Sequence, residues 1–206
     1  MFEDRVDAGV RLCQKLSIYS ERMNFIVVGL LRGGLIPAKV ISDKLNLKLF
    51  PLMVKKIPTP NNSELALGAM ISPKETYLNN DLIKDLKISD LELNKIIIQK
   101  WIELRFIRSK YKINKKEFKN KNVLLVDDGV ATGATVLVSQ EYLRKNGARD
   151  IILATPVIAT DTFNIVKKHF DAIIYLIKVK DFNSVGQFYK NFNQVADKEI
   201  EQILNI

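Results

Sequence analysis

The sequence contains a single cysteine, Cys13, among 206 residues, and no apolar run long enough to span a bilayer. One cysteine excludes an intrachain disulfide framework and indicates a reducing compartment. Cys13 lies in an apolar-periodic pattern, so we expect a buried thiol rather than a nucleophile. The opening residues, Met1–Arg5, do not have the pattern of a signal peptide. These features predict a cytoplasmic protein without a membrane partner.

Acidic residues are outnumbered by basic ones, which gives a formal net charge of +9. A basic balance is one sign of nucleic-acid binding. Here the lysines are spread along the chain, and neither an aromatic-interleaved basic platform nor a nucleic-acid motif accompanies them. We therefore expect no nucleic-acid partner and interpret the charge as a solvated surface. Positive charge also helps a protein to collect a polyanionic small substrate.

The stretch Val123–Thr135 organises the rest of the chain. It opens with four apolar residues, which predict a buried strand of a parallel sheet. Asp127 and Asp128 follow at the carboxyl end of that strand, and a short loop of Gly, Ala and Thr leads into a helical pattern. Small residues let backbone N–H groups turn inward around a phosphate, and the helix N-terminus adds partial positive charge. With the hydroxyls of Thr132 and Thr135, the pattern predicts an anion cradle.

The two carboxylates need another explanation, because they would repel a phosphate. Adjacent carboxylates suit a diol, whose two hydroxyls can donate to them. A phosphate with a diol one sugar ring away describes a ribose 5-phosphate. The alternative is an ordinary strand–loop–helix corner with solvated acids, which a lone Gly133 would not exclude. A P-loop is excluded, because no lysine follows the glycine in a Gly-Lys-Ser/Thr pattern.

A second constellation, Arg32, Gly33 and Gly34, follows a predicted buried strand over Phe25–Leu30. Two glycines let the backbone come close to a ligand, and the arginine adds a fixed cation. Taken alone the three residues also fit a plain turn. A helical pattern, Leu35–Leu45, follows directly.

Strand and helix patterns alternate, which predicts a single α/β domain over residues 1–206, a doubly wound parallel β-sheet flanked by helices. The fold is expected to carry a small hood or lid region. Residues 58–78 carry many turn formers and predict a loop that acts as the lid, although Leu65–Met70 could pair as a strand. The alternative for this segment is a floppy surface excursion. A capping-box pattern at Ser89 and Glu92 opens a long helix to about residue 112. The packing residues expected on it are Trp101, Leu104, Phe106 and Ile107.

With these segments in view, nearly the whole chain resembles the type I phosphoribosyltransferases, which bind phosphoribosyl pyrophosphate (PRPP). The resemblance is specific for a predicted subfamily with LxRGG and VDDGxATGAT motifs. The motifs stand in this sequence at Phe2–Arg5, Leu30–Gly34, Lys56–Ala69, Val126–Thr135 and Val185–Phe192.

The resemblance implies a transferase that moves ribose 5-phosphate from PRPP to a nitrogen nucleophile, in particular a nucleobase, and releases pyrophosphate. It implies Mg²⁺ as cofactor, PRPP and a small nitrogenous acceptor as partners, and a cis peptide between Leu31 and Arg32. It also implies that the segment after the second strand closes over the reaction centre. We further expect a homodimer.

The resemblance also implies a role for each motif residue. Asp127 and Asp128 are catalytic and hold the ribose diol, directly or as ligands of Mg²⁺, and Arg32 is catalytic as well. The 5-phosphate is held by Val130, Ala131, Thr132, Gly133, Ala134 and Thr135. Pyrophosphate is held by Arg32, Gly33, Gly34 and Lys56, and the acceptor by Phe182, Val185 and Gly186.

Ala131 departs from one branch of the family. The 6-oxopurine enzymes place an additional Asp just before the Thr-Gly of the loop, near N7 of the purine, and Ala131 stands there in this sequence. Hypoxanthine and guanine are therefore disfavoured as acceptors. Two other functions compete with transfer: a non-catalytic nucleotide or PRPP sensor on the same fold, and a hydrolase or lyase on a phosphorylated sugar. The sequence offers no nucleophile–base pair for the last.

Overall fold

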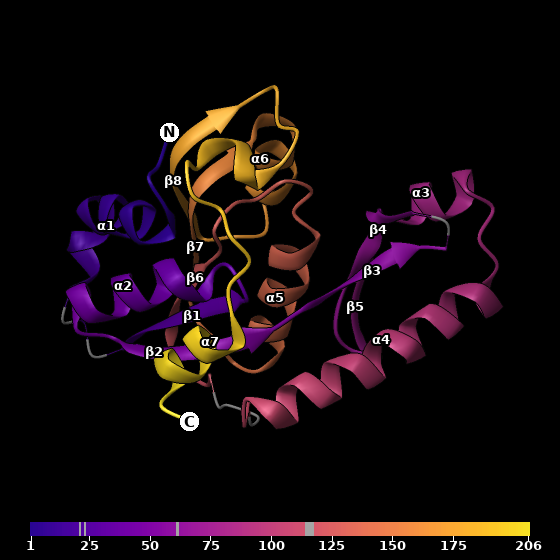
Figure 1. Ribbon diagram of the computed structural model, residues 1–206, viewed down its shortest axis with the longest axis horizontal. Coiled ribbons are helices and arrows are strands. Elements are labelled where there is room, and N and C mark those ends of the chain that lie inside the picture. The colour runs from indigo at the N-terminus through magenta and orange to yellow at the C-terminus, as the bar shows by residue number, and fades with distance from the viewer. Residues whose placement is uncertain (21, 23, 61, 114–117) are drawn as a thin grey trace.

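The computed structural model describes residues 1–20, 22, 24–60, 62–113 and 118–206. Its centre is a parallel sheet of five strands in the order β2-β1-β6-β7-β8 (Figure 1). The strands are β1 (Phe25–Leu31), β2 (Lys48–Met53), β6 (Asn122–Val126), β7 (Ile151–Ala159) and β8 (Ala172–Val179). This confirms the doubly wound α/β fold.

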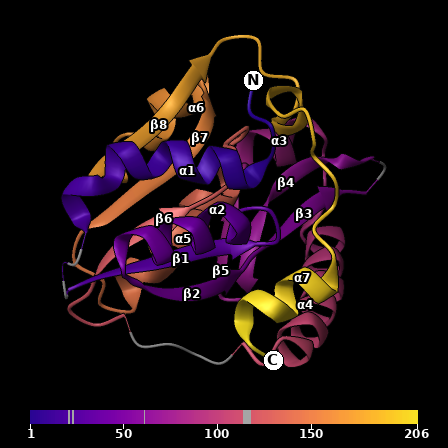
Figure 2. The same cartoon turned by 60° about the vertical axis from the view of Figure 1, so that its left-hand side comes forward.

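Helices cover both faces of this sheet, because the inner strands are apolar on both sides. Val27 and Leu124 point to one face, where they share a buried cluster with Leu12 and Ile41. Their sequence neighbours, such as Leu125, join the cluster on the other face. On the first face lie α1 (Arg5–Leu16) and α2 (Leu35–Leu45), in front of the sheet in Figure 2. On the second lie α5 (Ala134–Lys145) and α6 (Thr160–Val166).

A second, antiparallel sheet stands where we predicted a loop. Its strands are β3 (Lys55–Thr59), β4 (Asn62–Ser72) and β5 (Glu75–Leu78), in the order β3-β4-β5. The loop prediction for 58–78 is therefore wrong for the described residues, and the strand alternative at Leu65–Met70 is confirmed. Leu67 and Met70 are fully buried, so core packing outweighed the turn formers. The motif residue Asn61 lies outside the described residues.

The short helix α3 (Asn80–Asp85) leads from this sheet to the long helix α4 (Asp90–Lys110). The predicted capping box is confirmed, because Glu92 N donates to Ser89 Oγ and Ser89 N donates to the Glu92 carboxylate. Leu104 is fully buried, and Trp101 and Ile107 pack against the same cluster. Phe106 was expected to pack as well, but 74% of it is exposed. Phe106 stands two residues after buried Leu104, which puts it on the opposite side of the helix. Its side chain therefore faces away from the second sheet.

The N-terminal residues meet the segment that follows β8. Phe2 forms a parallel bridge with Tyr189, next to the short 3-10 turn η2 (Val185–Phe188). The chain then runs to α7 (Asp197–Leu204), which lies beside α4 in Figure 2. A second 3-10 turn, η1 (Ser17–Tyr19), follows α1. Cys13 is a buried free thiol, as expected. No helix formed by the described residues is long and apolar enough to cross a membrane.

Candidate functional site

The two constellations found in the sequence meet in space. β1 and β6 are adjacent parallel strands, with Gly29 paired to Val126, so the loops that follow them emerge at the same edge. A Cβ built on Gly33 would lie 1.9 Å from Oδ2 of Asp128. One built on Gly34 would lie 2.9 Å from Oδ1 of Asp127. Glycine is required here because the loop backbone lies directly against the two carboxylates.

The two carboxylates have different surroundings. Asp127 is half-buried, and its Oδ1 accepts a hydrogen bond of 3.0 Å from the backbone N–H of Asp128. Burial of the carboxylate, followed by the negative charge of Asp128, raises the pKa of Asp127 well above its ordinary value. The backbone bond and the positive charge of Lys56 act in the opposite direction. Lys56 is exposed at the start of β3, within electrostatic reach of the pair.

Asp128 has a partner that the sequence analysis did not single out. Nε of Arg5 donates to Oδ2 of Asp128 at 2.6 Å, and both side chains are only 12% exposed. The hydroxyl of Tyr189 donates to the backbone carbonyl of Asp128, also at 2.6 Å. Arg5 belongs to the opening motif Phe2–Arg5, which was noted for its resemblance and given no chemical role. Its place in that motif was the signal in the sequence that could have pointed to Arg5 as a site residue.

The loop of residues 130–135, predicted to hold a phosphate, is bonded to its neighbours in the fold. Val130 N–H donates to the carbonyl of Val157 at 2.9 Å, which ties the loop to β7, and Thr162 Oγ1 donates to the carbonyl of Ala131. Gly133 has φ of +79°, a conformation that favours glycine, and α5 begins at the next residue. The first turn of a helix leaves its N–H groups without intrahelical partners, so they point into the loop.

The side chains at this loop fit the predicted cradle. Thr132 is exposed and Thr135 is half-buried, so both hydroxyls can be reached by a ligand. The loop lies beyond the carboxylates along the chain, at the N-terminus of α5, where a bound anion meets the helix dipole.

The loop after β1 has the expected cis peptide between Leu31 and Arg32. Its arginine was expected as a cation for pyrophosphate. In the structure the guanidinium of Arg32 is paired with Asp197 of α7, with Nη1 2.5 Å from Oδ1, and its role toward pyrophosphate stays a prediction. The same carboxylate accepts from Tyr111 Oη at 2.6 Å and from Lys110 Nζ. Arg32 therefore joins this loop to the ends of α4 and α7.

The residues expected on the acceptor side lie over the carboxylate loop. A Cβ on Gly129 would be 2.4 Å from Cγ1 of Val185, so Val185 packs directly on the residue after Asp128. Gly186 lies against the ring of Phe192, and Phe182 packs on Phe188 with ring centroids 5.2 Å apart. We call the segment Val185–Asn193 the hood. The structure thus brings Val185 onto the loop that carries the carboxylates, whereas the described contacts of Gly186 are with Phe192.

The donor chemistry fits a magnesium ion that arrives with a phosphorylated substrate. Mg²⁺ prefers oxygen ligands and is commonly held by one or two carboxylates together with substrate phosphates. Asp127 and Asp128 are such a pair. Among the described residues there is no group of three or more acidic, histidine or cysteine side chains that could form an all-protein cage.

Comparison with known proteins places this arrangement in a family. The model for the phosphoribosyl transferase domain matches residues 4–189. A Mycobacterium tuberculosis (strain CDC 1551) protein named "Putative phosphoribosyl transferase MT0597" is 32% identical over 210 residues, which cover 100% of this chain and 46% of that protein. The chain thus spans about half the length of that relative. Uracil phosphoribosyltransferase of Thermosipho melanesiensis is 34% identical over 83 residues, 38% of this chain and 39% of that protein.

A solved structure shows the same fold across the whole chain. The crystal structure of TT1426 from Thermus thermophilus matches with a TM-score of 0.78 and 31% identity, and the match covers 98% of this chain and 97% of that one.

Proposed function

We propose, from the premise that this chain belongs to the phosphoribosyl transferase domain family, that it transfers ribose 5-phosphate from PRPP to a nitrogen nucleophile and releases pyrophosphate. The observation that carries the proposal is the contact between the two glycines of the β1 loop and the two carboxylates of the β6 loop. This contact places the backbone of Gly33 and Gly34, which could approach pyrophosphate, beside Asp127 and Asp128, which could hold a ribose diol. The predicted phosphate cradle, residues 130–135, follows directly in the sequence.

Binding follows from the chemistry of each loop. The 5-phosphate would lie at residues 130–135, where the N–H groups of the first turn of α5 and the hydroxyls of Thr132 and Thr135 converge. Pyrophosphate would lie along the backbone of Arg32, Gly33 and Gly34. Because the guanidinium of Arg32 is engaged with Asp197, its part is to hold this loop in place. Lys56 would supply a mobile cation nearby.

Asp127 and Asp128 would accept the ribose hydroxyls, and Mg²⁺, when bound there with PRPP, would offset the charge of the pyrophosphate. Breaking the bond from C1 to pyrophosphate develops positive charge on the ribose ring. Nearby carboxylates stabilise such charge, while the phosphate cradle fixes the ring so that C1 faces the acceptor. Water must be kept from C1, and the hood on one side with the β3–β4 hairpin on the other would limit its access.

For the acceptor we propose a planar nitrogen heterocycle between the hood and the strand end at Asp128. Val185 offers apolar contact beside Gly129, and the rings of Phe182 and Phe188, which are tilted by 50° to each other, each offer a flat face for stacking. Ala131 brings no carboxylate to the loop, so a 6-oxopurine would lack its partner near N7.

The deciding experiment supplies PRPP, Mg²⁺ and a panel of nucleobases and amines, and measures released pyrophosphate. Turnover with one acceptor supports the proposal, provided that Asp127→Asn combined with Asp128→Asn removes it. PRPP or a nucleotide that binds tightly but is never turned over would instead favour the non-catalytic sensor. No binding of PRPP or of any nucleotide would refute both.

A further inference from the structure

We propose that Arg5 is a positioning residue: it fixes the carboxylate of Asp128 for the ribose diol and fastens the hood to that carboxylate. This inference rests on the proposed function. It concerns a residue at the start of α1 that stands 123 residues before Asp128 in the sequence and contacts it in space.

One guanidinium makes three contacts. Its Nε donates to Asp128 Oδ2 at 2.6 Å, its Nη1 donates to the carbonyl of Asn193 at 2.9 Å, and its carbon lies 3.8 Å from the ring centroid of Phe192. A charge-assisted hydrogen bond, a backbone bond and a cation–π contact together hold the group in one orientation. Arg5 therefore holds the Asp128 carboxylate and the hood in fixed positions relative to each other.

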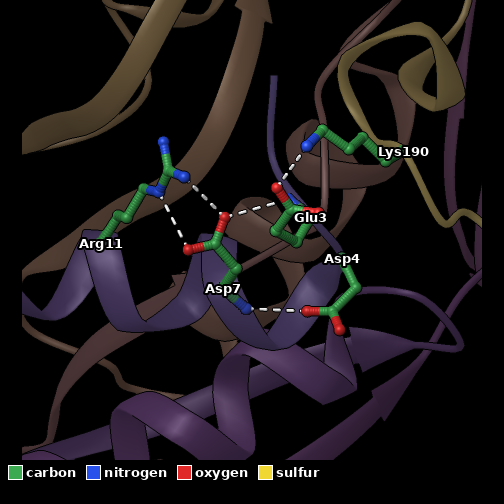
Figure 3. A network of polar contacts seen from close by, with 5 residues as sticks. All are labelled: Glu3, Asp4, Asp7, Arg11 and Lys190. Carbon is green, nitrogen blue, oxygen red and sulfur yellow. Dashed lines mark hydrogen bonds and ion pairs between the residues drawn. The ribbon is translucent and has the colours of Figure 1, made fainter.

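The segment that carries Arg5 is itself tied down. The Asp4 carboxylate caps α1 by accepting from Asp7 N at 2.9 Å, and Lys190 pairs with Glu3 at 2.6 Å (Figure 3). In the same view Arg11 holds the Asp7 carboxylate, which also accepts from the backbone N–H of Glu3. The backbone of Phe2 and Glu3 also bonds to residues 188, 190 and 191 of the hood. Cap, ion pair and backbone bonds fix where α1 begins, and hence where Arg5 points.

The geometry leaves one oxygen for a ligand. Arg5 takes Oδ2 of Asp128, and within the described part of the chain no group donates to its Oδ1. Oδ1 can therefore accept a ribose hydroxyl. Arg5 also offsets the charge of Asp128 in a site that must receive a polyanion. Without Arg5, two largely enclosed carboxylates would face PRPP with no cation bound to either, and PRPP would bind more weakly.

The test is calorimetric titration of PRPP with Mg²⁺ into full-length variants, which needs no acceptor. Arg5→Met keeps an unbranched apolar stem over Phe192 but loses charge and donors, and we expect about 10- to 100-fold weaker binding, the range for a hydrogen bond to a charged group. Arg5→Lys keeps the charge but not the fork that reaches both Asp128 and Asn193, so part of the affinity should return. Arg144→Met is the control: it removes an exposed ion pair with Asp171 at the far end of α5, and its affinity should equal that of the wild type.

The outcomes separate this inference from the proposed function. A wild type that fails to bind PRPP overturns the function itself. A wild type that binds, with Arg5→Met folded and equally tight or tighter, overturns the role of Arg5 alone, and tighter binding would show that Arg5 obstructs the site. If Arg5→Met unfolds, the affinity of Arg5→Lys tests the inference. An affinity equal to that of the wild type would contradict the positioning role of Arg5.

A second inference rests on different residues. We infer that the outward face of α4 binds the same face of a second copy of the chain, with the two helices antiparallel. Four large apolar residues lie exposed on that face: Leu91 at 63%, Ile98 at 57%, Ile102 at 64% and Phe106 at 74%. Their spacings of seven, four and four residues place them in one stripe. Exposed Lys95 stands between Leu91 and Ile98 on the same face. Single exposed apolar residues are ordinary, but four on one helix face mark an interface.

The charges on α4 favour an antiparallel arrangement of two copies of the helix. Asp90 and Glu92 are exposed at its first turn, and Arg105 is exposed near its end. An antiparallel copy brings the acidic end of each helix to the basic end of the other, whereas a parallel copy would bring like charges together. Such a contact is two-fold symmetric and closes on itself. α4 also runs along the outer edge of the second sheet in Figure 1, where another molecule can reach it.

Light scattering tests the dimer, and a disulfide tests its geometry. We expect a mass twice the 23.5 kDa of one chain, which Ile102→Glu combined with Phe106→Glu reduces to the monomer. Ile165→Glu, at another exposed isoleucine, is the control and should remain dimeric. Ile98→Cys lies near the middle of the stripe and should oxidise to a covalent dimer, while Leu91→Cys at one end should not. A monomeric wild type, a dimer that survives the double substitution, or cross-linking at Leu91→Cys would each overturn the inference.

Discussion

Arg32, at the start of the β1 loop, forms an ion pair of 2.5 Å with Asp197, 165 residues later on α7. The contact connects the candidate pyrophosphate loop to the C-terminal helix. Asp197 also accepts from Lys110 and Tyr111, so a single carboxylate gathers three donors from two distant parts of the chain. Burial of the Tyr111 ring, together with its bond to Asp197, raises the pKa of Tyr111 to about 12.

The Asp197 network should make stability depend on pH. Bonds from Lys110, Tyr111 and Arg32 lower the pKa of Asp197 below its ordinary value of about 3.9. A lowered pKa in the folded state stabilises the fold above the unfolded value, and that contribution is lost as the pH falls through the folded value. We expect Asp197→Asn to lower the melting temperature at pH 7 and to approach the wild type as the pH falls below about 4. Calorimetry measures this, with Asp43→Asn in the exposed Lys39 pair as control.

Asp127 should show a conflict between stability and binding. Its carboxylate lies beside Asp128, and its raised pKa means that the charged form is disfavoured in the fold. Replacement by the neutral isostere in Asp127→Asn should therefore keep or raise the melting temperature at neutral pH while weakening PRPP binding. Scanning calorimetry and titration with PRPP check both parts, and a destabilised variant with intact affinity would contradict this account.

Gly33→Ala should remove PRPP binding, because the new methyl group would lie 1.9 Å from Oδ2 of Asp128 unless the loop shifts. Gly147→Ala is the matched control. Gly147 has φ of +85° after α5, so alanine there should cost about 1–2 kcal/mol of stability without touching the loops of the site. Equal PRPP affinity for wild type and Gly33→Ala would show that the backbone is not close to the ligand.

The lid prediction now applies to the end of the β3–β4 hairpin. Leu67–Ile71 are buried in the core, so their amides should exchange slowly with or without ligand. Residues 58–66 should become protected when PRPP and Mg²⁺ are added, because closure shields C1 from water. Hydrogen exchange followed by mass spectrometry measures this. Equal protection of 58–66 in both states would remove the lid role.

The acceptor is tested by steady-state assays with hypoxanthine, guanine, xanthine, adenine, uracil and orotate. We expect neither hypoxanthine nor guanine to be turned over efficiently, since Ala131 offers no carboxylate to N7. Turnover of either base at a rate comparable to the best acceptor would mean that another group serves in place of that carboxylate.

Local patterns were enough for much of the scaffold. Val123–Val126 could be assigned to a buried strand because four apolar residues in a row suit only the interior of the sheet. The capping box of Ser89 and Glu92 and the left-handed Gly133 depend on neighbours a few residues away. The strand-end positions of Asp127 and Gly33 follow from the same periodicity, and parallel topology then requires the two loops to meet.

Contacts between distant residues were decided only by the tertiary structure. No spacing in the sequence predicts that Arg5 pairs with Asp128, that Arg32 pairs with Asp197, or that the side chain of Phe106 is exposed. Turn formers within 58–78 favoured a loop, yet burial of Leu67 and Met70 against distant elements produced a strand. Periodicity records what a residue needs from its immediate neighbours. Which distant cation finds a carboxylate, and which apolar face stays open, depends on how whole elements pack.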